Sequence, residues 1–370
     1  MTANVDLSKR ENEKMASSDH IYWLGLKMIP AIFNKLYGLV ENAGGPKELW
    51  FASKKRLIEI GLEEDKALEA IKARSCIDLE AEYLNFINSG GYILTNEDKE
   101  YPFLLRQAAN HPKAVFVKGS LHNYENAVAI VSSRRASMLG KSIATELAAG
   151  LAEVGVVVVS GVARGIDTAS HWGAINAGGL TLGVLGCGFN VVYPPENKKL
   201  YGEIASNGAL ISEYPPNTFP QAINFPARNR IIAGLCQGVV VVEAGEKSGA
   251  LITADFALDY GRDVFAVPGN SKNEMSRGTN GLIKQGAYLV ETVDDIIEVL
   301  GIDKEKKCYK NNLSSEEQRI LNLIGWEPTH IDEIVCRSGW LLHNVSSILL
   351  SLEISGYLRK DISGSYMRMK

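Results

Sequence analysis

The chain has 370 residues, 39 Lys and Arg against 43 Asp and Glu, a formal net charge of -4, and 46% hydrophobic and 22% charged residues. At about 100–200 residues per domain, this length predicts two or three domains. The composition excludes disorder over most of the chain and a uniformly basic coat for nucleic acid, although it allows a local basic groove.

No apolar run approaches the roughly 18 residues of a membrane span, and the polar first residues lack the apolar core of a secretion signal. The cysteines are far apart and form no CxxC pair, which argues against a zinc ribbon or a redox dithiol. We therefore expect reduced cysteines in a cytoplasmic protein that does not contact a membrane.

Residues 1–19 are rich in Lys, Glu, Asn and Ser and are predicted to be a disordered tail. From 20 to 96 the pattern is amphipathic, with Ile58, Leu62, Ala67 and Ile71 at helical spacing. This predicts a small helical domain, in which Ile60-Gly61-Leu62 loosely resembles the turn of a SAM or helix-hairpin-helix domain.

Short β-branched runs alternate with helical stretches from 97 to 300. Continuous apolar runs of this kind suit strands that are covered on both faces, as in a parallel sheet. A helix with an apolar stripe at Leu139, Ile143, Leu147 and Leu151 lies between the first two runs, and Gly155 is its expected stop. The alternation predicts a doubly wound α/β domain with a mostly parallel sheet. The expected strands are 128–131, 156–159, 182–185, 239–242 and 264–267.

Residues 301–312 are charged and polar and are predicted to be a linker to a third domain at 313–370. Ser314 to Glu317 forms a capping box, Thr329 is an expected helix cap, and Ser363-Gly364 indicates a hairpin turn. Three helices followed by a hairpin are typical of a winged helix. Its third helix, at about 342–354, contains no Lys or Arg, so we expect protein contact rather than sequence-specific DNA recognition.

The loops after the parallel strands are the expected ligand site, because ligands of open α/β sheets bind beyond the carboxyl ends of the strands. The loop Ser160 to Asp167 contains Gly161, Arg164 and Gly165 before a helix, which suits phosphate, although glycine turns after strands are also common in purely structural roles. Ser133, Arg134 and Arg135 follow the first strand, either as phosphate ligands or as a solvated surface pair.

A helix that begins near Asn224 carries Arg228, Asn229 and Arg230 near its N-terminus, where cations oppose the helix dipole. An anionic ligand would compensate for that repulsion. Lys247, Ser248 and Gly249 repeat the pattern at the next helix start, and Asn280 lies in a later polar turn.

Catalysis finds little support in these loops. A single carboxylate such as Asp167, Glu213 or Glu243 is more often a helix cap or an arginine partner than a general base. His171 has no Ser or Cys partner at a recognisable spacing, and no metal cluster is evident. No catalytic residue, metal or cofactor is predicted.

These motifs, in this order, resemble the DNA-processing protein A family (DprA, also called Smf) over about 95–290. The resemblance rests on the Ser133, Ser160–Asp167 and Lys247–Gly249 motifs, on Phe225 to Ala233, and on further segments at 101–105, 193–197, 212–215, 265–269 and 276–280. It implies a non-enzymatic protein with a Rossmann-like domain that binds single-stranded DNA. It further implies protection of incoming strands during natural transformation, loading of RecA recombinase, and a homodimer formed through the Rossmann-like domain.

The family's basic pocket would correspond to Arg134, Arg135, Arg164, Arg228, Arg230 and Lys247, with the Ser160–Asp167 loop holding phosphate. One departure is Ser132, where the family usually has Gly, because a Cβ there narrows the approach of a phosphate. Phe225 and Tyr193 could stack on bases or serve as packing residues. The alternative function is a phosphoribohydrolase-like enzyme acting on nucleotides, but Pro268-Gly269-Asn270 lacks the rest of the PGGxGT loop that such enzymes use.

Overall fold

The structure is a computed structural model that describes residues 19–121, 124–133, 136–303, 315–325, 329–354, 357–360 and 364–368. It divides into two compact units, Met1–Lys307 and Cys308–Lys370, and each is considered by itself. The expected tail at 1–19 lies outside the described residues except for Asp19, as does most of the expected linker at 301–312. Within the described part of the chain, no helix is both long and apolar enough to cross a bilayer.

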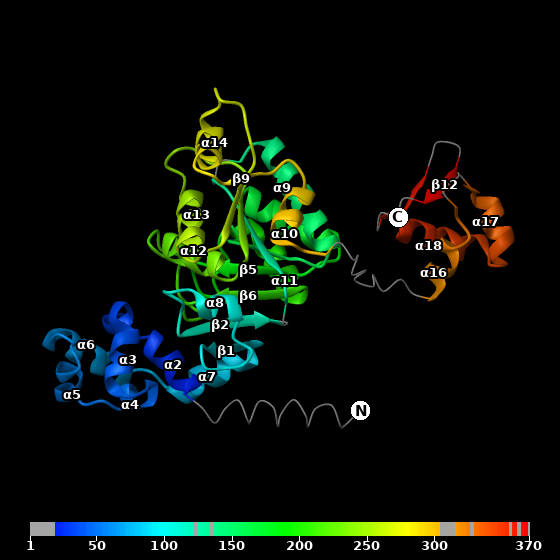
Figure 1. The fold of residues 1–370 in the computed structure, drawn as a ribbon. Coiled ribbons are helices and arrows are strands. Elements are labelled where there is room, and N and C mark those ends of the chain that lie inside the picture. Colours follow the sequence, from blue (N-terminus) through cyan, green and yellow to red (C-terminus); the bar gives the residue numbers. More distant parts are fainter. Residues whose placement is uncertain are drawn as a thin grey trace. The chain divides into compact units, whose positions relative to one another are not determined.

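The first unit is built on one sheet whose strand order is β1-β2-β6-β5-β4-β3-β7-β8-β9 (Figure 1). The strands are β1 Gly91–Thr95, β2 Ala114–Gly119, β3 Ala127–Val131, β4 Val157–Ser160, β5 Thr181–Leu185, β6 Gly208–Ser212, β7 Gly238–Val241, β8 Asp263–Ala266 and β9 Tyr288–Leu289. From β6 to β9 every neighbouring pair is parallel. The doubly wound, mostly parallel sheet is therefore confirmed, and the five expected strands are β3, β4, β5, β7 and β8.

Two strands, β2 and β1, extend the sheet beyond β6 through antiparallel pairing, and of these only β2 runs opposite to the parallel strands. β2 pairs antiparallel with β6, and β1 pairs antiparallel with β2. The amphipathic pattern from 20 to 96 predicts helices, but residues 91–95 form β1 and belong to this sheet. An apolar segment as short as Gly91–Thr95 suits a strand as well as a helix end, and only its pairing with β2 decides the matter.

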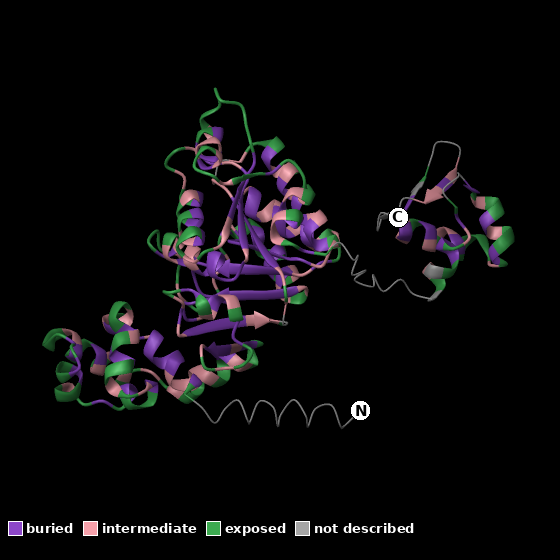
Figure 2. Ribbon diagram, viewed as in Figure 1, coloured by how far each residue is buried: buried purple, intermediate pink, exposed green. Residues whose placement is uncertain are grey.

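Helices cover both faces of the sheet, and its strands are mostly buried except the edge strand β9, whose two residues are exposed (Figure 2). Side chains from α12 and α13 pack on one face. Side chains from α9 and α15 pack on the other. The helices of this region are α8 Phe103–Gln107, α9 Met138–Glu153, α10 Ile166–Asn176, α11 Lys198–Ser206, α12 Asn224–Gly234, α13 Gly249–Asp259, α14 Arg277–Lys284 and α15 Val293–Leu300, with 3-10 turns η2 Pro195–Asn197 and η3 Glu274–Ser276.

Helix α9 follows the expected stripe only in part. Leu147 and Leu151 are buried against the sheet, but Leu139 is 70% exposed because it lies in the first turn of the helix. Gly155 follows the helix with a φ of 82°, a left-handed conformation that suits glycine and ends the helix as expected.

The N-terminal helices pack around Trp23, Leu26 and Leu49, and this apolar core continues into sheet residues such as Phe116 and Leu210. The expected turn at Gly61 lies between α5 and α6 and has a φ of 106°, where a residue with a Cβ would be strained. The elements are α2 His20–Lys27, η1 Pro30–Lys35, α3 Leu36–Ala43, α4 Pro46–Trp50, α5 Lys54–Glu59, α6 Glu64–Ser75 and α7 Leu79–Asn88. A boundary between this region and the sheet at residue 96 stays a prediction.

A buried ionic cluster around Glu213 joins these helices to the sheet. Glu213 follows β6 and is 6% exposed, and its carboxylate lies 2.5 Å from Arg230 Nη2 and accepts a hydrogen bond from the Tyr37 hydroxyl. Lys27, at the end of α2, donates to the Glu213 carbonyl oxygen over 3.1 Å. Burial lowers the pKa of Lys27 to about 8, because lost hydration outweighs the attraction of Glu213.

The described residues of the second unit form three helices followed by the antiparallel strands β11 and β12, which is the order expected for a winged helix. They are α16 Ser315–Leu321, α17 Ile331–Ser338 and α18 Leu342–Ile354, with strands β10 Thr329–His330, β11 Leu358–Lys360 and β12 Ser365–Arg368. Thr329 does not cap α17, because it pairs with Tyr366 in the sheet; the cap is His330, whose Nδ1 accepts from the Asp332 amide over 3.3 Å. Ser314 and Ser363 lie outside the described residues.

We expect Glu213→Gln to lower the free energy of unfolding of the first unit by about 3–5 kcal/mol near neutral pH, because it leaves the buried charges of Lys27 and Arg230 without their counter-ion. Burial alone would raise the pKa of Glu213, but Lys27, Arg230 and the Tyr37 hydroxyl together hold it below its ordinary value. The stabilisation is therefore present above about pH 4.5 and is lost as the pH falls through the lowered folded value. Urea unfolding across pH measures this.

The matched control is Glu63→Gln, which breaks an ion pair with Lys35 at a side chain that is 68% exposed. Its effect should stay within about 1 kcal/mol. Equal stability losses in the two variants, or a loss in Glu213→Gln that does not diminish as the pH falls, would show that the buried cluster does not stabilise the fold in this way.

Candidate nucleic-acid interface

A hollow of about 380 Å³ opens at the carboxyl ends of β3, β4 and β7. The chain passes from β3 to β4 on one side and reaches β7 on the other, so the loops after these strands diverge and leave space between them. We call it the switch-point hollow. Its lining residues are Val131, Ser132, Ser133, Ala163, Asp167, Phe225, Pro226, Arg228, Asn229, Ile232, Ser248, Gly249, Ala250 and Thr253.

Three helices begin at this hollow. Asp167 lies in the first turn of α10, Pro226 in that of α12, and Gly249 is the first residue of α13. The Ser248 hydroxyl caps α13 by accepting from the Ala250 amide over 3.3 Å. Helix N-termini carry partial positive charge and unpaired amide groups, so their convergence favours an anion.

The loop after β3 is fixed to the end of β7. The Ser133 amide and the Ser132 hydroxyl both donate to the Glu243 carbonyl oxygen, over 2.9 and 2.8 Å. The Glu243 carboxylate in turn accepts from the Ser137 amide over 2.8 Å at the start of α9. Glu243 is therefore a structural cap, and the side chain of Ser132 is directed to a backbone partner. Arg134 and Arg135 lie outside the described residues.

In the loop after β4, Ser160 and the two glycines have structural roles within the fold. Ser160 is fully buried and its hydroxyl donates to the Ile130 carbonyl over 2.7 Å, so it does not line the hollow. Gly161 is needed because a Cβ there would approach the Arg228 guanidinium to 2.5 Å. Gly165 precedes α10 with a φ of 89°, a left-handed conformation that favours glycine.

Arg228 lines the hollow but is only 5% exposed. Its guanidinium donates to the carbonyl oxygens of Gly161, over 2.7 Å, and Val184. Burial raises the pKa of Asp167, and the nearby Arg228 opposes that rise. The repulsion between Arg228 and the α12 dipole is thus offset within the protein by carbonyl dipoles, so an anionic ligand is not needed to explain this cation.

Arg230 is not part of the hollow, which corrects its expected position. Arg230 lies two residues after Arg228, and this rotation of about 200° around the helix places its side chain on the other side of α12, where it pairs with Glu213. Asn280 also lies elsewhere: its carboxamide bonds to both the amide and the carbonyl of Gly269, over 3.2 and 2.9 Å, and so holds the turn after β8. A DNA contact by either residue stays a prediction.

The remaining expected residues are close to the solvent. Asn229 lines the hollow and donates to the Gly249 carbonyl over 3.2 Å, which ties α12 to α13. Lys247 is exposed and directly precedes Ser248. Arg164 is 57% exposed and forms a two-point ion pair with Glu196, with Nη2 and Oε2 3.0 Å apart.

Aromatic side chains adjoin the hollow as well. Phe225 lines it and contacts Tyr193, with ring centroids 5.5 Å apart and an interplanar angle of 40°. Tyr193 is 37% exposed, so part of its ring remains accessible to a base. Thr253 was not foreseen; it lies one helical turn after Gly249, and that spacing on α13 could have indicated its place.

The grouping of possible metal ligands and the surroundings of His171 bear on the chemistry that these loops could perform. Among the described residues, no three or more His, Cys, Asp or Glu side chains are grouped to hold a metal ion. His171 is fully buried and its Nδ1 lies 2.6 Å from the Thr181 hydroxyl. Burial, together with Arg228, lowers the pKa of His171 to about 3, so its imidazole is neutral at physiological pH.

Comparison with known proteins gives one consistent result. Residues 92–301 match the family described as DNA recombination-mediator protein A, and residues 309–361 match the DprA winged helix domain. Protein Smf of Escherichia coli (strain K12) is 38% identical over 291 residues, which are 75% of this chain and 78% of that protein.

Two solved structures agree. The X-ray structure of DNA processing protein A (DprA) from Streptococcus pneumoniae has a TM-score of 0.64 and 35% identity and covers 75% of this chain and 96% of its own. DNA processing protein A from Helicobacter pylori, described by its single-stranded DNA binding mode, has a TM-score of 0.52 and 31% identity and covers 57% of this chain and 95% of its own. The chain therefore belongs to the DprA/Smf family, with its Rossmann-like domain and C-terminal winged helix.

Proposed function

We propose that this protein binds single-stranded DNA through the phosphates, at the switch-point hollow, without chemical turnover. It protects incoming strands during natural transformation and recombination and loads RecA recombinase onto them. It acts as a cytoplasmic homodimer that associates through the Rossmann-like domain. The Helicobacter pylori relative, whose single-stranded DNA binding has been described, supports the choice of ligand.

The observation that carries the proposal is the convergence of three helix N-termini on one hollow beside the exposed cations Lys247 and Arg164. Backbone amides and helix dipoles favour phosphate whatever the base, which suits binding without sequence preference. In the sequence, Arg134 and Arg135 follow Ser133 directly and would add two cations to the same loop.

Lys247→Gln and Arg164→Gln should each weaken binding to oligodeoxynucleotides of different sequence by a similar factor. Each loses one phosphate contact, so the slope of log affinity against log salt should flatten by about 0.7 per substitution. Fluorescence anisotropy with labelled single and double strands, across a salt series, measures both quantities.

The matched control is Lys55→Gln, which removes an 88% exposed lysine of α5. It should leave affinity and slope unchanged. If the double variant of Arg164 and Lys247 bound as the unmodified protein does, with the same slope, the hollow would not be the binding site.

If the protein loads RecA, it should accelerate the assembly of RecA on single strands rather than only compete with RecA for those strands. The rate of RecA filament growth should rise when the strand is first coated with this protein. The double variant should lose the effect, because it no longer holds the strand. Filament growth that slows in proportion to added protein would contradict loading.

The nucleotide-processing alternative is opposed by several contacts. Glu243 caps α9, His171 is sealed inside the fold, and the Asn280 carboxamide fills the turn at Gly269. None of these groups is available as a general base. The turn at Gly269 is also closed by a side chain rather than left open to a ribose phosphate.

Incubation with nucleoside monophosphates should therefore leave them intact. Chromatography of the reaction for free base tests this over hours at micromolar protein. The Asp167→Asn variant serves as the comparison, since Asp167 is the carboxylate that lines the hollow. Base release at enzymic rates that disappears in this variant would establish the alternative.

A further inference from the structure

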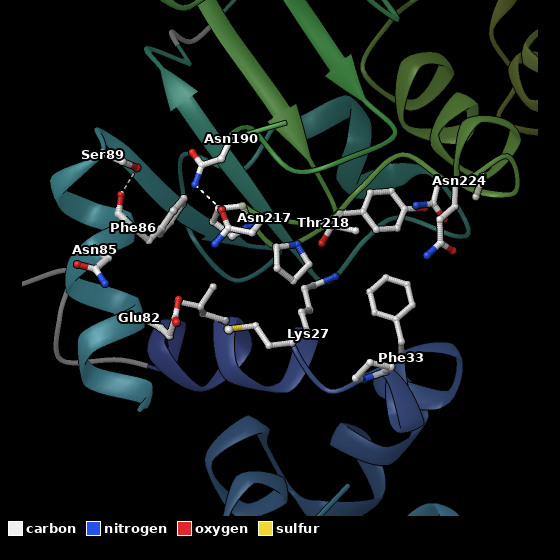
Figure 3. Close-up of a pocket in the computed structure, with 18 of the residues that line it drawn as sticks. Lys27, Phe33, Glu82, Asn85, Phe86, Ser89, Asn190, Asn217, Thr218 and Asn224 are labelled. Carbon is white, nitrogen blue, oxygen red and sulfur yellow. Dashed lines mark hydrogen bonds between the residues drawn. The ribbon is translucent and has the colours of Figure 1, made fainter. Parts of the chain in front are cut away.

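A second and larger pocket, of about 680 Å³, lies between the N-terminal helices and the loop that follows β6 (Figure 3). We call it the interdomain pocket. Side chains from α2, η1 and α7 form one side, and residues 214–224 form most of the other. Its volume falls within the roughly 300–1,000 Å³ typical of small-molecule sites. The phosphate-binding role of the switch-point hollow does not account for it.

Flat aromatic faces lie at both ends of this pocket. Phe33 is half-buried and nearly parallel to Tyr214, with centroids 5.6 Å apart and an angle of 14°. Phe86 is stacked on Phe189 at 6.3 Å and 9°. Figure 3 shows Phe33 and Phe86 on opposite sides of the space. Phe86 is only 3% exposed and belongs to the apolar wall, so the half-buried ring of Phe33 is the one that offers a stacking surface to a planar ligand.

Side-chain amides dominate the polar part of the lining. They belong to Asn34, Asn85, Asn190, Asn217, Gln221 and Asn224. Asn190 donates to Asn217 over 2.8 Å, but the Asn224 carboxamide is 8% exposed and finds no partner among the described residues. Each carboxamide offers both donors and an acceptor, the combination that pairs with the edge of a nucleobase.

The charges of the pocket favour a neutral ligand. Among the described lining residues, Lys27 is the single cation and Glu82 the single anion. The Lys27 ammonium already donates to the Glu213 carbonyl and the Tyr37 hydroxyl. A phosphate would find no uncommitted cation here, whereas an uncharged base can stack and pair. The pocket and the hollow thus suit different parts of a nucleotide.

Helix α12 connects the two sites. Asn224 and Ala227 line the interdomain pocket, whereas Phe225, Arg228 and Asn229 line the switch-point hollow. The two groups lie on different sides of the same first turns of α12. On the adjoining loop, the apolar side chains of Phe219 and Ile223 are 74% and 75% exposed, and Ile223 also lines the interdomain pocket.

We propose that the interdomain pocket receives one unpaired nucleobase, stacked on Phe33 and paired with Asn224, from the strand whose phosphates lie at the switch-point hollow. This inference rests on the proposed function for the source of the base. The same chemistry would fit the base of a free nucleoside, and the experiment distinguishes the two sources.

The test compares a short single strand with an abasic strand of the same length, which has the same phosphates and no bases. Phe33→Leu keeps the apolar volume and removes the flat ring, and Asn224→Leu keeps the size and removes the pairing edge. Each substitution should weaken binding of the base-containing strand by about tenfold, equivalent to about 1.4 kcal/mol, and leave binding of the abasic strand unchanged. Phe51→Leu, at a 67% exposed aromatic near α4, should change neither.

A second arm measures binding of free deoxynucleosides by equilibrium dialysis. If Phe33→Leu and Asn224→Leu weaken binding of the base-containing strand alone, the pocket is assigned to a base of the strand. Nucleoside binding that both variants lose, without any strand effect, assigns it to a free nucleoside. If neither readout responds, or if both strands weaken equally, the inference is overturned. Failure of the proposed function is separate: the unmodified protein would then bind neither strand, even at low salt.

Discussion

The position of β3 is the constraint on which the functional edge of this protein depends. β3 lies between β4 and β7, and the chain leaves it toward one side of the sheet and returns on the other. The loops at the carboxyl ends consequently separate, and helices α10, α12 and α13 all begin beside the gap. Strand order alone therefore creates the hollow and surrounds it with helix N-termini and backbone amides, before any charged side chain is added.

On the other side of α12, the buried carboxylate of Glu213 is the contact that holds the neighbouring elements together. It brings Arg230 from that helix, Lys27 from α2 and Tyr37 from α3 to one buried carboxylate. Because these partners come from the sheet and from the N-terminal helices, the cluster determines how the helices meet the sheet. This packing of the helices on the sheet also forms the walls of the interdomain pocket, because Phe33 contacts Tyr214 only when η1 lies against the loop after β6. Any other packing of these helices would leave the buried charges without their partners, which is costly.

Much of the fold could be predicted because its cause is local. The parallel strands are continuous apolar runs, because both faces of the sheet are covered. Helix α9 is bounded by the cap Ser137 and by Gly155, which act only on residues next to them in the sequence. β1 and β2 could not be predicted in this way, because an antiparallel extension depends on pairing with β6 far along the chain. The same limit applies to the arginines. The carbonyl partners of Arg228 at Gly161 and Val184, and the contact of Arg230 with Glu213, are set by topology and are invisible to residue spacing.

Ser132 illustrates how a side chain can be accommodated at the edge of the sheet that we propose binds phosphate. A Cβ at this position would narrow the approach of a phosphate if the side chain pointed into the hollow. The hydroxyl instead donates to the Glu243 carbonyl, which also accepts the Ser133 amide. The ends of β3 and β7 are thereby fastened by two hydrogen bonds to one oxygen, and Glu243 extends the connection to the start of α9. The serine therefore stiffens the floor of the hollow, and the surface left for an anion is built from backbone amides and helix ends whose positions the sheet already fixes.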